Sequence, residues 1–122
     1  MKCLVVDDSA TMRRIVVNAL KSIGYDNVVE AGDGSDALQK CDGSIELIIT
    51  DWNMPVMGGL EFVRALRANP THARTPILMV TPRSVKEDIL QAVEAGVSSY
   101  ILKPFTPQVL KEKIDQILSL AA

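Results

Sequence analysis

The stretch Lys2-Cys3-Leu4-Val5-Val6-Asp7-Asp8-Ser9 decides the fold class, because a short apolar run ends abruptly in two acids. The run is continuously apolar, as expected of a parallel strand that is buried on both faces of a sheet. Similar runs recur along the chain, and segments with apolar residues at helical spacing separate them. The five runs are Lys2–Val6, Asn27–Ala31, Leu47–Thr50, Ile77–Thr81 and Tyr100–Leu102. This alternation predicts an α/β fold, a doubly wound five-stranded parallel sheet with five helices and right-handed crossovers.

The intervening segments predict where the helices begin, end and pack. Ser9 or Asp8 can cap the first helix, Gly24 stops it, and Gly96 stops the fourth helix. The second, fourth and fifth helices are expected near Ser35–Cys41, Val85–Ala95 and Pro107–Leu120. Helical spacing predicts which side chains face the core. They are Met12, Ile15, Val16, Ala19, Leu20, Ile23, Leu60, Val63, Leu66, Ile89, Leu90, Val93, Leu110, Ile114, Ile117 and Leu118.

Length and composition bound the class of protein. A chain of 122 residues is expected to form a single domain over 1–122, without an output domain. The net charge of −2 argues against nonspecific binding to nucleic acid, which needs a basic surface. The apolar runs have strand length, and the N-terminus lacks the pattern of an export signal. We therefore expect a cytoplasmic protein that does not insert into a membrane.

The cysteines and the single histidine do not suggest a metal or catalytic centre. Cys3 and Cys41 lack C-x-x-C spacing and are expected to be free thiols of a reducing compartment. His72 is the single histidine, and it lies in a polar segment where we expect it to be solvated. One histidine alone supports neither a zinc site nor a catalytic dyad.

Charged residues follow three of the predicted strands. Asp7 and Asp8 come after the first, Asp51 after the third and Lys103 after the fifth. Because the carboxyl ends of parallel strands share one edge of the sheet, these side chains are expected to meet there. Crowded carboxylates are costly unless a cation or ligand uses them. Carboxylate oxygens suit Mg²⁺, and an ionised aspartate is a competent nucleophile toward a phosphoryl group.

Each of these residues also has a purely structural interpretation. Asp7-Asp8 could cap a helix, and Asp51 could be a turn residue. Lys103 could be an ordinary surface lysine, and Thr81 an ordinary strand residue. Together, however, the signals favour a phosphoryl-transfer site, with Lys103 and the Thr81 hydroxyl facing the phosphoryl oxygens.

The motifs resemble the receiver domain of two-component response regulators, and the stand-alone receivers of chemotaxis in particular. The resemblance rests on Val5-Val6-Asp7-Asp8-Ser9, Asp51-Trp52-Asn53-Met54-Pro55, Thr81 and Tyr100-Ile101-Leu102-Lys103-Pro104-Phe105. It implies the flavodoxin-like strand order 2-1-3-4-5.

The resemblance also implies a role for each site residue. Asp51 would accept the phosphoryl group, and Thr81 and Lys103 would hold it. Tyr100 would be an aromatic switch coupled to Thr81, and the Lys103–Pro104 bond would be cis. Mg²⁺ would be held by Asp7, Asp8, Asp51 and the backbone carbonyl of Asn53.

Two features depart from the family pattern. Pro82 follows Thr81 and has no N–H to offer a phosphoryl oxygen, and it restricts the backbone of Thr81. Arg83 comes next and could reach the phosphate or be solvated. Gly58 stands where an acid is frequent, and the pair Gly58-Gly59 is expected to loosen the start of the third helix.

We therefore expect a phosphorylation-dependent switch rather than an enzyme, with self-catalysed phosphorylation and dephosphorylation. A histidine kinase or a small phosphodonor would supply the phosphoryl group. The output would be contact with a protein such as a flagellar motor switch component, through the face of the fourth helix, fifth strand and fifth helix. A phosphatase is a further partner, and the chain is expected to be a monomer.

Three alternatives remain open at this point. One is a receiver of another pathway, acting as a phosphorelay or phosphate sink. Another is a phosphatase of the haloacid-dehalogenase type with an aspartate nucleophile, although that class needs Asp-x-Asp where this chain has Asp7-Asp8. The third is a flavodoxin-like cofactor binder, which needs a phosphate-binding loop where these acids stand.

Overall fold

The fold follows the predicted alternation of strands and helices. In this computed structural model, residues 1–52, 54, 56–81 and 86–121 are described, without the side chains of 86–89, 120 and 121. The elements are β1 (Lys2–Val6), α1 (Ala10–Ser22), β2 (Asn27–Ala31), α2 (Gly34–Lys40), β3 (Leu47–Asp51), α3 (Gly59–Ala68), a 3-10 turn (Pro70–His72), β4 (Ile77–Thr81), α4 (Lys86–Ala95), β5 (Ser99–Leu102) and α5 (Pro107–Ala121). The predicted strands are confirmed to within one residue at each end.

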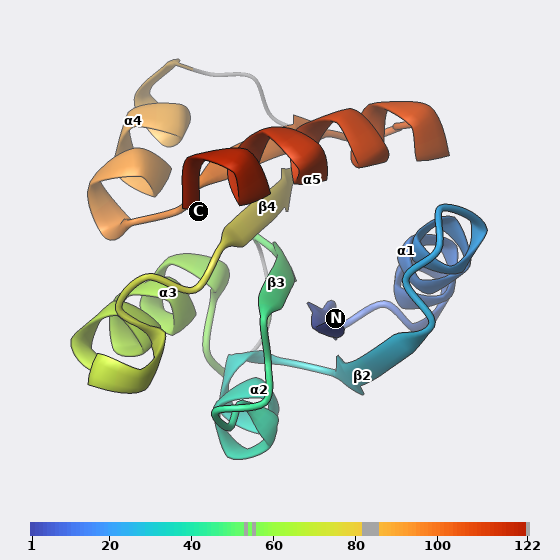
Figure 1. The fold of residues 1–122 in the computed structure, drawn as a ribbon. Coiled ribbons are helices and arrows are strands. Elements are labelled where there is room, and N and C mark those ends of the chain that lie inside the picture. The colour runs from blue at the N-terminus through green and yellow to red at the C-terminus, as the bar shows by residue number, and fades with distance from the viewer. Residues whose placement is uncertain (53, 55, 82–85, 122) are drawn as a thin grey trace.

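All strand pairs are parallel, and the sheet order is β2-β1-β3-β4-β5 (Figure 1). The fold class and the implied order 2-1-3-4-5 are both confirmed. The register aligns Val6 with Thr50, Asp51 with Val80, and Thr81 with Leu102. The carboxyl ends of the four strands β1, β3, β4 and β5 therefore reach the same edge of the sheet.

The helices cover the sheet in two layers, with α1 and α5 on one face and α2, α3 and α4 on the other (Figure 1). Successive residues of a strand pack alternately against the two helix layers. In β1, Cys3 and Val5 pack toward α1 and α5, while Leu4 and Val6 pack toward α2 and α3. Burying a large aliphatic side chain contributes about 1.5–3 kcal/mol. Among the described residues, no helix is long and apolar enough to cross a membrane.

The predicted cap of the first helix and the predicted glycine stops of the first and fourth helices are confirmed. Helix α2 begins and ends one residue before its predicted bounds, and the predicted start of the fourth helix at Val85 lies outside the described residues. The Ser9 hydroxyl accepts a hydrogen bond from the Met12 N–H at 3.2 Å and so caps α1. Gly24 and Gly96 follow α1 and α4 with φ of 100° and 110°, which other residues rarely adopt.

Three predicted core positions are wrong. Ile15 on α1 is 47% exposed, and Leu90 and Val93 on α4 are 50% and 58% exposed. Helix α1 buries the stripe formed by Val16, Val17, Ala19 and Leu20, so Ile15 lies at its margin. The described part of α4 packs through Ala92 and Ala95, which turns its larger aliphatic side chains outward. The side chain of Ile89 lies outside the described residues.

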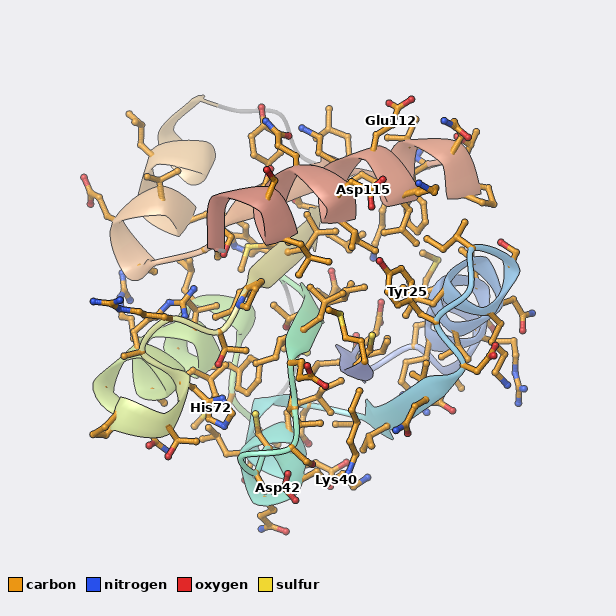
Figure 2. The ribbon with its side chains drawn as sticks, viewed as in Figure 1. Tyr25, Lys40, Asp42, His72, Glu112 and Asp115 are labelled. Atoms are coloured by element: carbon orange, nitrogen blue, oxygen red, sulfur yellow. The ribbon has the colours of Figure 1, made fainter. Side chains whose placement is uncertain are left out.

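The expectation of a solvated His72 is also wrong, since its exposed fraction is 1%. The His72 Nδ1 lies 3.0 Å from the Thr75 hydroxyl, and its Nε2 lies 3.5 Å from the Cys41 sulfur (Figure 2). The Arg67 guanidinium donates to the carbonyls of His72 and Thr75, which folds this segment against α3. Both cysteines are free as predicted, and burial raises the pKa of the Cys3 and Cys41 thiols to about 11, so both are neutral thiols.

Candidate functional site

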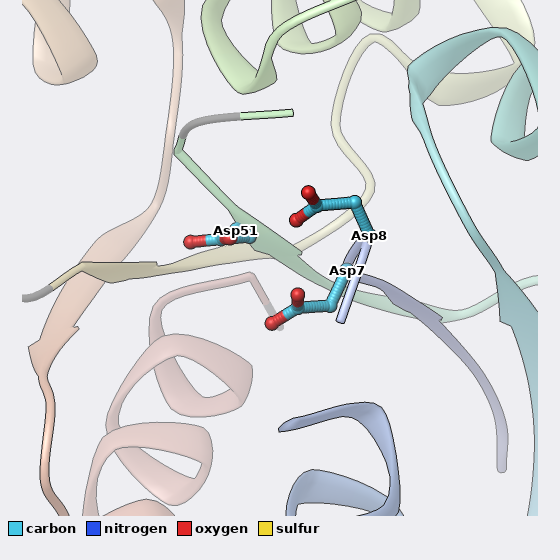
Figure 3. Close-up of side chains that lie close together, drawn as sticks. All are labelled: Asp7, Asp8 and Asp51. Carbon is cyan, nitrogen blue, oxygen red and sulfur yellow. The ribbon is translucent and has the colours of Figure 1, made fainter. Parts of the chain in front are cut away.

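Three carboxylates lie together at the carboxyl edge of the sheet. Asp7 and Asp8 directly follow β1, and Asp51 is the last residue of β3. Each offers an oxygen within 4.8 Å of the others, and Figure 3 shows the three side chains close together. Asp7 and Asp51 are buried, with exposed fractions of 3% and 9%, whereas Asp8 is exposed. The cluster therefore has two buried carboxylates and one that is exposed to solvent.

The environment of Asp7 is unfavourable for a negative charge. Burial raises its pKa above the ordinary 3.8, and the charges of Asp51 and Asp8 add to this shift. The Ser9 N–H donates to Asp7 Oδ1 at 2.8 Å and, with Lys103, lowers the pKa in part. The site therefore holds negative charge that a cation could stabilise.

Lys103 supplies the positive charge of the cluster. Its Nζ lies 3.3 Å from Asp51 Oδ1 and 3.6 Å from Asp7 Oδ2. Its backbone N–H donates to the Thr81 carbonyl at 2.9 Å, which ties it to the end of β4. The Lys103–Pro104 bond is cis, as the resemblance implied. Asp51 Oδ1 also accepts the Trp52 N–H at 2.8 Å, so two donors orient this carboxylate.

The two residues expected to switch lie on neighbouring strands. Thr81 ends β4 and is buried, one residue beyond the Val80 that pairs with Asp51. Tyr100 is half-buried on β5, and Lys113 Nζ lies 5.4 Å from its ring centroid. Tyr100 and Lys113 line a groove of about 400 Å³ between β5 and α5. The remaining predicted site residues, Asn53, Pro82 and Arg83, lie outside the described residues.

Gly59 is a site-supporting residue whose role sequence reasoning missed. A Cβ there would lie 2.3 Å from the Asp51 carbonyl oxygen and 3.0 Å from that of Trp52. The Gly59 N–H also donates to the Trp52 carbonyl at 2.8 Å. The start of α3 is thus packed directly on the backbone of Asp51. Gly58, in contrast, has space for a Cβ.

The loop that joins β3 to α3 contains a residue with an unusual backbone conformation. Val56 has φ of 68° and is 84% exposed. A β-branched residue in this left-handed region is strained.

The sequence profile of the response regulator receiver domain matches residues 3–115. The chain belongs to this family. The receiver is 50% identical to "Chemotaxis protein CheY1" of Helicobacter pylori strain J99, with 97% of each chain covered. It is 51% identical to a "Chemotaxis protein CheY homolog" of Campylobacter jejuni, covering 97% of this chain and 92% of the relative. The solved structure of the chemotaxis response regulator CheY4 of Vibrio cholerae has a TM-score of 0.88 at 38% identity, covering 95% of this chain and 97% of that chain.

Receiver domains bind Mg²⁺ at an acidic pocket, and this receiver has residues that fit the ion. Asp7, Asp8 and Asp51 offer the hard oxygen donors that Mg²⁺ prefers, with Asp8 open to the solvent that would complete its shell. CheY-like receivers are signalling switches rather than classical enzymes.

Proposed function

We propose that this receiver accepts a phosphoryl group on Asp51 from a histidine kinase, in a Mg²⁺-dependent reaction, and thereby changes its binding to other proteins. The observation that carries the proposal is the convergence of three carboxylates within 4.8 Å, with Lys103 Nζ 3.3 Å from Asp51. Crowded acids of this kind are common in sites that use a cation, and a lysine at their inner side can face an anion.

In the proposed reaction a carboxylate oxygen of Asp51 forms a bond to phosphorus. The bond from phosphorus to the donor's leaving atom breaks, and that atom keeps the electron pair. Asp7, Asp8, Asp51 and the backbone carbonyl of Asn53 would hold the ion. Mg²⁺, when bound, offsets the repulsion between the carboxylate and the incoming phosphoryl oxygens.

The remaining residues would act on the acyl phosphate once it has formed. Lys103 would exchange its contact with Asp51 for the phosphoryl oxygens, and Thr81 would donate its hydroxyl to them. Movement of Thr81 would then change the environment of Tyr100, two pairs away in the sheet register. Pro82 and Arg83 would modulate this response.

The names of the relatives support chemotaxis or motility as the pathway. We propose a monomeric, cytoplasmic regulator whose output is a protein such as a flagellar motor switch component, with a phosphatase as a further partner. A phosphorelay or phosphate-sink receiver is the second candidate, because the same site chemistry serves it. An Asp-nucleophile phosphatase is disfavoured, since Asp7 and Asp8 are adjacent and an Asp-x-Asp pair is missing there.

Incubation with acetyl phosphate and Mg²⁺, followed by intact-mass measurement, tests the proposal. The parent is expected to gain one phosphoryl group and Asp51→Asn none. Asp26→Asn, at an exposed loop acid, is the matched control and is expected to be labelled as the parent is. Continuous release of phosphate without a labelled protein would favour the phosphatase, and labelling of Asp51→Asn at the parent rate would overturn the assignment. Binding of a motor-switch peptide with and without beryllofluoride tests the output separately.

A further inference from the structure

Arg13 on α1 contacts the site from outside the carboxylate cluster, and the proposed reaction gives it no role. Its Nη1 donates to the Asp7 carbonyl oxygen at 2.5 Å. Its Nε forms an ion pair with Glu30 Oε1 on β2 at 3.3 Å. The guanidinium thus joins α1 to β2 and to the residue that directly follows β1, beside the site.

The Asp7 carbonyl lies just beyond the end of the sheet ladder. The last paired residues of β1 are Val6 with Ala31 and Val6 with Thr50. The Asp7 N–H still reaches the Ala31 carbonyl at 3.1 Å, but the Asp7 carbonyl is past the last rung. Arg13 supplies the donor for this carbonyl, and a hydrogen bond from a charged donor is stronger than a neutral one.

This carbonyl belongs to the peptide unit that joins Asp7 to Asp8. Because a peptide unit is planar, holding its oxygen restrains the rotation of the plane, and this limits the directions in which the two Cα atoms project their side chains. The Ser9 N–H holds the side chain of Asp7 by donating to its Oδ1 at 2.8 Å. Arg13 is therefore placed to set how two of the three clustered carboxylates face each other.

Arg13 is itself held in place. The Arg13 side chain is 22% exposed and its partner Glu30 is 45% exposed, so the ion pair is partly shielded on the arginine side. Lys40 Nζ donates to the Glu30 carbonyl at 2.8 Å and pairs with Asp36 at 3.1 Å. These contacts line a polar groove of about 380 Å³ between α1 and α2.

We propose that Arg13 is a positioning residue that raises the Mg²⁺ affinity of the receiver by holding the Asp7–Asp8 peptide. The inference rests on the proposed Mg²⁺ binding. A purely electrostatic effect has the opposite sign, because removing a cation near an acidic site strengthens cation binding. The direction of the change therefore separates positioning from charge.

The experiment compares Arg13→Ala and Arg13→Lys with the control Arg14→Ala, which removes an exposed arginine from the next position of the same helix. Mg²⁺ affinity is measured by Trp52 fluorescence and by calorimetry, without phosphodonor. We expect Arg13→Ala to bind Mg²⁺ roughly tenfold more weakly, as for the loss of an outer partner of a metal ligand. Arg13→Lys keeps the positive charge but lacks the planar guanidinium that contacts two partners at once, so we expect an intermediate Mg²⁺ affinity. Arg14→Ala should bind Mg²⁺ as the parent does.

The amide resonance of Asp8, whose N–H belongs to the held peptide, gives a second measurement. It is expected to shift in both Arg13 variants without Mg²⁺ and to stay in place in Arg14→Ala. Mg²⁺ binding by Arg13→Ala that equals or exceeds that of the parent overturns the inference. Parent-like affinity in Arg13→Lys overturns it as well. If Arg13→Ala fails to fold, the measurement on Arg13→Lys alone decides. If the parent protein binds no Mg²⁺, the metal step of the proposed function and this inference are both overturned. If the parent binds Mg²⁺ and the Arg13 variants bind it with the same affinity, only the inference is overturned.

Discussion

Lys103 Nζ lies 3.3 Å from Asp51 Oδ1, so the lysine that directly follows β5 pairs with the carboxylate that ends β3. The same nitrogen lies 3.6 Å from Asp7 Oδ2 and holds the two buried acids together. The ammonium group therefore offsets part of the negative charge of both carboxylates. The proposed phosphorylation of Asp51 would therefore require Lys103 to change its contacts.

Lys103→Met removes this counter-charge. We expect the free energy of unfolding without Mg²⁺ to fall by about 2 kcal/mol, less than the about 3–5 kcal/mol of a fully buried pair. The Mg²⁺ affinity should rise, because a competing cation is gone, while the phosphorylated fraction should fall. Urea unfolding and Trp52 fluorescence measure these effects, with Lys111→Met as the control for a surface ion pair. Unchanged Mg²⁺ affinity would contradict the pairing.

Asp7→Asn removes a buried charge whose pKa is raised by burial. Without Mg²⁺ at neutral pH, we expect the free energy of unfolding to increase by on the order of 1 kcal/mol. Between pH 3.8 and the raised pKa the native parent binds more protons than the unfolded chain, so this contribution to its stability falls as pH rises. The difference in the free energy of unfolding between Asp7→Asn and the parent should therefore be small below this pH range and should reach its full value above it. Urea titrations at several pH values decide this, and a difference that grows toward low pH would refute it.

Gly59→Ala places a methyl group 2.3 Å from the Asp51 carbonyl oxygen. We expect a loss of about 2–4 kcal/mol in the free energy of unfolding, since backbone on both sides must shift. Phosphorylation by acetyl phosphate should also slow, because Asp51 moves. Gly58→Ala is the matched control: its Cβ has 3.7 Å of space to the Trp52 carbonyl oxygen, so it should leave both quantities nearly unchanged. Equal effects at the two glycines would show that close packing is not the cause.

Val56→Asn relieves a strained backbone position. Asparagine tolerates φ of 68° better than valine, and the exposed valine side chain loses little packing. We expect a gain of about 1 kcal/mol in the free energy of unfolding, and a smaller gain for Val56→Ala. Thermal unfolding tests the order of the three proteins, and a less stable asparagine variant would mean that valine makes a compensating contact.

Pro82→Ala restores a backbone N–H after Thr81, at a position outside the described residues. A hydrogen bond to a charged group contributes about 1.5–3 kcal/mol, so we expect beryllofluoride to bind more tightly to the variant. Titration of Trp52 fluorescence in both proteins measures this affinity. Equal beryllofluoride affinities in the two proteins would show that another group already donates the missing hydrogen bond.

The strands and the acidic edge could be predicted because both depend on local patterns. A continuous apolar run ending in Asp7-Asp8 or Asp51 marks a buried strand and its carboxyl end, and parallel topology then brings the acids together. Ile15 was misplaced because helical spacing alone leaves the edge of an apolar stripe undetermined. The burial of His72 depends on Cys41, which directly follows α2, and on Arg67 of α3.

Arg13 and Gly59 were missed for a related reason. Each acts on a backbone carbonyl, that of Asp7 or Asp51, and such contacts leave no residue pattern in the sequence. A glycine at the start of a helix next to an acidic strand end is the one local signal that could have suggested a close approach.

The way α4 is attached to the sheet has a consequence for how the domain distributes its stability. Its described buried side chains are the methyl groups of Ala92 and Ala95, whereas α5 is anchored by Leu110, Ile114 and Ile117. Methyl groups bury little apolar area, so these two side chains hold α4 with far less hydrophobic free energy than the three aliphatic side chains that anchor α5. Under the proposed function, a movement of α4 would leave the core beneath α5 intact. With Leu90 and Val93 facing outward, such a movement would change the apolar surface offered to the proposed protein partner.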